Sequence, residues 1–221
     1  MINRQILSGV LVGIVATFIV SSLVVEKRLH NLRVVLDDSI SKQEQNILEL
    51  ILVIGAGSGP ETDTVAEIIP TCQSENSQQY DELLASLDKG LTQGQLANLN
   101  NLFNQCGSIP AQRRGVMVLL LEKEVQFHED KVSQRVLLGK DTYSQEMLQD
   151  IKSLTQKERE VQTHFNALVK LQGEIIQTLL SGAAISSDAI NTIQNQVQTV
   201  QKMYAAAIAE ASQLRTVVVT P

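Results

Sequence analysis

Apolar residues recur with a heptad spacing along the C-terminal half of the chain. From residue 147 to residue 179 they alternate between steps of four and three residues, and only Glu158 and Gln172 interrupt the series. The same repeat runs from residue 190 to residue 214 without a polar interruption. Such a repeat is typical of helices that pack knobs into holes in a left-handed supercoil. The predicted coiled-coil seam consists of Met147, Ile151, Leu154, Val161, Phe165, Leu168, Ile175, Leu179, Ile190, Ile193, Val197, Val200, Tyr204 and Leu214.

This half of the chain predicts long helices that are joined by short turns. Pro110 fits the first position of one helix, and Thr142 opens a capping-box pattern for a second helix that ends before Gly182. A third helix follows that turn. Short connections between heptad helices favour an antiparallel bundle, which we assign to residues 107–215. We expect residues 216–221 to form a short tail that is frayed or docks as a strand.

Two shorter apolar stripes lie in the middle of the chain, on either side of a turn at Lys89 and Gly90. They predict a compact helical hairpin over residues 72–106, with Cys72 before its first helix and Cys106 after its second. Antiparallel helices bring these ends together, so we expect a disulfide that stabilises the fold by roughly 3–4 kcal/mol in a loop-entropy model. Paired cysteines favour an oxidising compartment, and two reduced, buried thiols in cytosol are the alternative. The stripes are Tyr80, Leu83, Leu84 and Leu87, followed by Leu96, Leu99, Leu102 and Phe103.

An uncharged apolar segment near the N-terminus, residues 6–25, is long enough to cross a membrane. As a helix it would extend ~30 Å, which matches the hydrocarbon core of a bilayer. Charged residues flank it, with Arg4 before and residues 26–28 after. A cleaved signal peptide has a shorter apolar run and a small-residue cleavage site, and a lipoprotein anchor needs a cysteine earlier than Cys72. We therefore predict an uncleaved signal anchor after a short N-terminal tail of residues 1–5.

Small residues form a stripe on this predicted span. Gly9, Gly13, Thr17 and Ser21 follow one another at four-residue spacing and therefore share one helix face. Small side chains let two helix backbones approach closely, which favours helix association in lipid. Small residues are also common in membrane helices without any such role. We expect this face to mediate self-association.

Residues 51–60 read ILVIGAGSGP, an apolar run followed by glycines, as in a dinucleotide-binding strand and its phosphate loop. That fingerprint requires a third glycine where this chain has Pro60, and a second strand that ends in an acid. No such strand follows. The apolar residues upstream recur instead at helical spacing, with Gln43 at one heptad position. We therefore predict no nucleotide site, but a helix over residues 26–54 and then a hinge with a short helix over residues 55–71.

The composition agrees with long helices and limits the partners. The chain is 43% hydrophobic but only 3% aromatic, so aliphatic seams must supply its cores. A net charge of −6 argues against nucleic acid, which binds to basic faces. Basic residues after the span slightly outnumber those before it and favour a cytoplasmic C-terminal side, whereas the cysteines favour an extracytoplasmic one. We expect the N-terminus inside and the C-terminal domain outside, with cytoplasmic placement as the alternative.

Two similar segments of seven residues contain candidate metal ligands. EKEVQFH at 122–128 and EREVQTH at 158–164 each place a glutamate and a histidine four residues apart on one helix face. These pairs would form a site if the two faces met across packed helices. Helical di-metal proteins use a spacing of three and additional inward glutamates. Ordinary surface pairs, with one histidine in a seam, are therefore the preferred interpretation of the four residues Glu124, His128, Glu160 and His164.

Together these features predict an all-α chain in which a single N-terminal transmembrane helix continues into a coiled-coil-rich antiparallel helical bundle. They predict no catalytic residue, no cofactor and no small-molecule substrate. We expect a non-enzymatic structural or assembly subunit of a cell-envelope complex, with lipid and protein partners that are either further copies or other subunits. An extracytoplasmic sensory or ligand-binding bundle is the alternative, and a metal-binding bundle ranks below it.

Overall fold

The computed structural model describes residues 4–56, 72, 74–87, 90–139, 142–182 and 187–219. The side chains of residues 4–23, 56, 74, 142–144, 187 and 190 lie outside this description. The regular elements of the described residues are all helical, which confirms the all-α part of the predicted fold class. In chain order they are α1 (Arg4–Ala56), α2 (Ser74–Ala85), α3 (Gln93–Phe103), the π-helical turn η2 (Asn104–Ser108), α4 (Ile109–Leu137), α5 (Thr142–Leu180) and α6 (Ser187–Val219).

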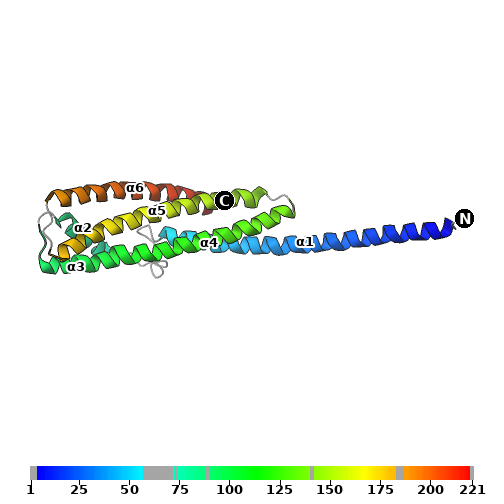
Figure 1. Ribbon diagram of the computed structural model, residues 1–221, viewed down its shortest axis with the longest axis horizontal. Helices are drawn as coiled ribbons and strands as arrows, with labels where there is room; N and C mark the ends of the chain where they lie inside the picture. The colour runs from blue at the N-terminus through cyan, green and yellow to red at the C-terminus, as the bar shows by residue number, and fades with distance from the viewer. Residues whose placement is uncertain are drawn as a thin grey trace.

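Helix α1 is one uninterrupted helix of 53 residues. At 1.5 Å per residue it extends about 80 Å, and Figure 1 shows its N-terminal half projecting well beyond the other helices. Its C-terminal half packs into the bundle through four isoleucines at heptad spacing. The buried residues of this stripe are Ile40, Ile47, Ile51 and Ile54. The segment ILVI therefore ends a helix, as the periodicity predicted, whereas residues 57–71 of the predicted hinge lie outside the described residues.

The predicted membrane span forms the N-terminal part of α1. Among the helices of the described residues, none is long and apolar enough to cross a membrane. Most side chains of residues 6–25 lie outside the description, including those of the small-residue stripe Gly9, Gly13, Thr17 and Ser21. The structure thus gives the transmembrane span and its association face no support, and both stay predictions.

The bundle consists of the C-terminal half of α1 together with α4, α5 and α6. Helix α4 packs against both α1 and α5, while α6 packs along α5 and contacts α1. Successive long helices run antiparallel, as Figure 1 shows. The core between them contains buried Val118, Leu121, Ile151, Leu154 and Val161, with Ala207 and Ala211 of α6. Alanines at these α6 positions allow the helix to approach its neighbours closely.

The predicted seam is buried more completely on α5 than on α6. On α5, Ile151, Leu154, Val161, Leu168 and Ile175 are buried, and the two polar interruptions, Glu158 and Gln172, are buried with them. Met147, Phe165 and Leu179 of α5 and Ile193, Val197, Val200, Tyr204 and Leu214 of α6 are half-buried, while the side chain of Ile190 is not described. The rings of Phe165 and Tyr204 stack across the two helices at 5.4 Å.

Helix α6 continues through most of the predicted tail. It ends at Val219, and Val218 is buried in the main core. The prediction of a frayed tail or docking strand from residue 216 onward was therefore wrong. A β-branched run such as VVV lowers helix propensity only slightly, and burial of Val218 against the bundle outweighs that loss.

The helical backbone continues without interruption from the hairpin into the bundle. Helices α3 and α4 are joined by the π-helical turn η2, in which Ile109 N–H donates to the carbonyl of Asn104, five residues back. Helix α4 begins at Ile109 and has Pro110 in its first turn, which confirms the predicted helix start. A π turn accommodates proline because it reorganises the backbone hydrogen bonds beside the residue that lacks an N–H.

The hairpin forms a second, smaller core against the end of α5. Tyr80, Leu87, Leu99 and Leu102 of α2, α3 and the connection between them pack against Ile175 and Ile176 of α5. A capping box of Thr92 and Gln95 starts α3. The predicted disulfide is present in the structure, where Cys72 is bonded to Cys106 across a Cα–Cα distance of 4.6 Å. The bond ties the chain before α2 to the end of the hairpin.

Phe103 is held in a notch that two glycines create. A Cβ at Gly173 would lie 3.0 Å from Phe103 Cζ, and one at Gly107 would lie 3.4 Å from Cδ2 of the same ring. The ring of Phe103 therefore occupies the space that an α5 side chain would otherwise fill, and it joins the hairpin core to α5.

Gly173→Ala is expected to lower the free energy of unfolding by about 1–3 kcal/mol, because the Phe103 ring must shift to accommodate the methyl group. The matched control is Gly94→Ala on α3, where a Cβ would meet no atom within 4 Å. That change is expected to raise stability by about 0.5 kcal/mol through the entropy of the unfolded chain. Chemical denaturation of both variants checks the prediction. Equal or greater stability of Gly173→Ala than of the parent would contradict this packing.

Candidate functional site: a buried charge cluster

A charged cluster lies in the middle of the bundle, where most positions are apolar. Arg114 Nη2 of α4 lies 2.5 Å from Glu158 Oε2 of α5, and Arg215 Nε of α6 lies 2.6 Å from Glu158 Oε1. The side chains of Arg114, Glu158 and Arg215 are only 2%, 0% and 15% exposed. Gln162 completes the set, since its Oε1 accepts a hydrogen bond from Arg114 Nη1 at 2.9 Å. One carboxylate thus bridges guanidinium groups from both neighbouring helices.

The C-terminal turn of α1 borders the same cluster. A Cβ at Gly55 would lie 3.2 Å from Arg215 Cδ and 3.3 Å from its Nη1, so the glycine leaves room for the arginine. The last carbonyls of a helix lack intrahelical partners and carry the negative end of its dipole. A guanidinium at this place is therefore favourable, and the cluster involves all the long helices of the bundle.

The charged groups of this cluster have a structural role and do not form an acid–base pair. Burial lowers the pKa of Arg114, while the charge of Glu158 acts in the opposite direction. A guanidinium still keeps its proton in proteins, so it cannot serve as a general base or acid. Arg114 Nε and Arg215 Nη2 are buried without a hydrogen-bond partner among the described residues. Because the cluster contains two arginines and one glutamate, it carries one more positive than negative charge, and Glu158 is its central counter-ion.

Sequence periodicity identified part of this cluster. Glu158 was recognised as a polar interruption of the α5 seam, but Arg114, Gln162 and Arg215 were missed. A signal for Arg114 was available, because buried Ala111, Arg114, Val118, Leu121, Val125, His128 and Val132 follow one another at steps of three and four. Extending that seam backward from Val118 would have placed Arg114 inside. Arg215 follows the seam residue Leu214, and the spacing of apolar residues gives no indication that Arg215 joins the cluster.

A second polar group lies between α1 and α4. His128 is fully buried, and its Nε2 lies 3.7 Å from Glu44 Oε1 of α1. Gln43, which precedes Glu44 on α1, donates a hydrogen bond to the carboxylate of Glu124, and Lys131 Nζ donates to Gln43 Oε1 at 2.8 Å. The heptad position of Gln43 is therefore buried and hydrogen-bonded to α4. These contacts fix the register between the two helices.

The structure does not bring the candidate metal ligands together. Glu124 and His128 contact α1, as described above. Glu160 and His164 lie on α5, where Glu160 pairs with Lys157 and its Oε1 is 3.8 Å from His164 Nε2. Among the described residues, no group of three or more His, Cys, Asp or Glu side chains has the geometry to hold a metal ion.

His128 makes stability depend on pH. Burial, and then the charge of Lys131 on α4, lower the pKa of His128 in the folded chain, and Glu44 of α1 is the nearby counter-charge. The unfolded chain therefore binds the proton more readily, so stability is complete above the unfolded pKa of about 6.5 and falls as the pH drops below it.

We therefore expect the parent chain to lose stability from about pH 7.5 to about pH 5.5, measured as denaturant midpoints. His128→Leu should show a smaller loss over this interval. His164→Gln is the control, because it removes a histidine that does not lie between α1 and α4, and His128→Leu should lose less stability over this interval than this control does. A parent-like slope in His128→Leu would contradict the assignment.

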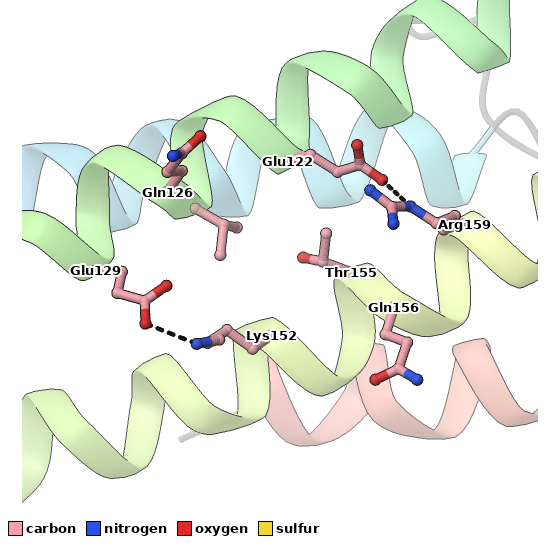
Figure 2. A pocket seen from close by; sticks show the side chains of 8 residues that line it. Glu122, Gln126, Glu129, Lys152, Thr155, Gln156 and Arg159 are labelled. Carbon is pink, nitrogen blue, oxygen red and sulfur yellow. Dashed lines mark hydrogen bonds and ion pairs between the residues drawn. The ribbon is translucent and has the colours of Figure 1, made fainter.

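An open groove runs along the surface between α4 and α5 (Figure 2). Ion pairs cross it at two points, with Arg159 Nε bonded to Glu122 and Lys152 Nζ 2.8 Å from Glu129 Oε1. Val125 and Thr155 line it between these pairs. Exposed ion pairs of this kind contribute about 0–1 kcal/mol each. They align the two helices, and the carboxylates that border the groove are already paired with cations.

The chain was compared with models of protein families, with curated proteins and with solved structures, and none of these matches it. Its function is therefore argued from its own residues.

Proposed function

We propose that this chain is a non-enzymatic, single-pass membrane protein that serves as a structural or assembly subunit of a cell-envelope complex. The observation that carries the proposal is the continuity of α1, which joins the apolar segment of residues 6–25 to the bundle core without an interruption. A helix of this length sets the bundle at a fixed distance and orientation from its anchor. This arrangement suits a protein that holds partners in place.

Exposed apolar side chains on α4 support a role in assembly. Val116, Leu119, Leu120 and Phe127 are 56%, 59%, 43% and 60% exposed. Leu119, Leu120 and Phe127 follow Val116 by three, four and eleven residues and so lie along one side of a long helix. Leu32 and Val35 of α1 are exposed in the same way. Apolar residues that follow a helical repeat on the surface favour contact with another protein.

The disulfide supports an extracytoplasmic position for the bundle. Disulfides persist in oxidising compartments, whereas cytosolic thiols are kept reduced. With the bundle outside, the N-terminus of the anchor remains inside. Alkylation of the chain in intact cells, followed by mass spectrometry, tests this orientation, and free Cys72 and Cys106 thiols would contradict it.

Alkaline extraction of membranes tests the anchor. We expect the full chain to stay in the membrane pellet and the double variant Leu11→Lys and Val15→Lys to be released, because each lysine at the centre of a span costs about 2.5–3.5 kcal/mol. The matched control is Leu32→Lys with Val35→Lys, which adds the same charge to the same helix outside the span. Release of the parent chain, or equal retention of the Leu11 and Val15 variant, would contradict the proposal.

A further inference from the structure

A pocket lies where α2, α5 and α6 meet, away from the charge cluster. It has a volume of about 480 Å³, within the range of small-molecule sites. Its floor is apolar and includes Leu87 and Ile175, which are 5% and 4% exposed. Its rim is polar and comprises Asp81 together with Gln194, Gln198 and Gln201, while Gln172 lies deeper. Among the described residues, the lining thus combines a hydrocarbon surface with several amide groups and one charged side chain.

The side chain of Gln172 is held in a fixed position in this pocket. Its side chain is only 5% exposed, and Tyr80 O–H donates a hydrogen bond to its Oε1 at 3.1 Å. Burial, and then the charge of Asp81, raise the pKa of Tyr80, so the phenol stays protonated and remains the donor. With Oε1 engaged by Tyr80, the Nε2 group of Gln172 is the part of this side chain that can donate to a ligand.

Asp81 is the only charged side chain among the described residues that line the pocket. Its carboxylate has no ion-pair partner among the described residues, and partial burial raises its pKa. The anion is therefore less stable here than in water, and a cation placed beside it would reverse that effect. An anionic ligand would instead meet repulsion from Asp81, and the part of the lining that the structure describes contains no basic side chain to offset it.

We propose that this pocket binds a small organic cation, an ammonium group on a short hydrocarbon body. The ammonium group pairs with Asp81, the hydrocarbon lies on Leu84, Leu87, Ile175 and Val197, and an oxygen acceptor on the ligand or a bound water takes the Gln172 Nε2 donor. The pocket is independent of the membrane anchor and of the assembly role, so either proposal can fail without the other.

Three probes of equal chain length test the charge preference. n-Butylammonium, n-butyrate and n-butanol are offered to the full chain in detergent micelles, with empty micelles as the blank, and binding is followed by saturation-transfer NMR and titration. Butylammonium is expected to bind at least about five-fold more tightly than the other two, since about 1 kcal/mol corresponds to this factor. No binding of butylammonium, or equal binding of butyrate, would overturn the proposal.

Variants then locate the site. Asp81→Asn changes an exposed side chain and should leave the fold intact, while butylammonium binding weakens about five-fold. The matched control is Asp130→Asn on α4, which removes the same charge outside the pocket and should bind like the parent chain. Gln172→Leu should weaken binding as well, with circular dichroism as the check on folding. Parent-like binding by Asp81→Asn would contradict the site.

Discussion

Glu158→Gln is expected to lower the free energy of unfolding by about 3–5 kcal/mol, the largest effect that we expect from the removal of a single charge in the bundle. The substitution keeps the shape of the side chain but removes its charge. Arg114 and Arg215 then face each other across a buried site without their counter-ion. Chemical denaturation at constant pH and salt measures the loss.

Two comparisons separate this electrostatic effect from a general sensitivity of α5. Glu146→Gln removes a charge from an exposed position on the same helix and should change stability by less than about 0.5 kcal/mol. Replacing the whole cluster by apolar residues, Arg114→Met with Glu158→Leu and Arg215→Met, should cost less than Glu158→Gln alone, because no buried charge is left unpaired. A loss below about 1 kcal/mol for Glu158→Gln would contradict the burial of the cluster.

Replacement of Cys72 and Cys106 by alanine is expected to lower the free energy of unfolding by about 3–4 kcal/mol. The two residues are 34 positions apart, and the crosslink removes the entropy of that loop from the unfolded chain. The effect should concentrate on the hairpin core around Tyr80 and Leu99, because the crosslink joins the two ends of this hairpin. Hydrogen exchange of α2 and α3 measures the local part of the loss.

Reduction of the disulfide in the parent chain is the control for this prediction. The parent chain should approach the stability of the double alanine variant when reduced, and the variant itself should not respond. A parent chain that keeps its denaturation midpoint after complete reduction, verified by alkylation and mass, would show that the crosslink contributes little.

Local periodicity accounts for the parts of the fold that were predicted well. The regular apolar steps on α5 require one buried face along the whole helix, so the amino-acid pattern alone places Ile151, Leu154 and Val161 in a seam. The disulfide followed from the hairpin, because two apolar stripes around Lys89 and Gly90 bring Cys72 and Cys106 to the same end.

The features that were missed depend on contacts between distant segments. The start of α4 at Pro110 was predicted, but the π turn that joins this helix to α3 was not. Val218 extends α6 because the core offers it a buried place. Arg215 belongs to the charge cluster through Glu158 of another helix, and the pocket around Gln172 needs α2, α5 and α6 together. None of these contacts produces a periodic pattern of apolar residues in the sequence of a single segment.

The native mass and composition of the protein after extraction in mild detergent show whether the chain assembles with partners through its helices. We predict a complex heavier than one 24.3 kDa chain, with further copies or other envelope subunits in stoichiometric amounts. Gly9→Leu with Gly13→Leu, or Leu120→Ser with Phe127→Ser, should reduce that mass. A single chain at every protein and detergent concentration, unchanged by either pair of substitutions, would contradict the account.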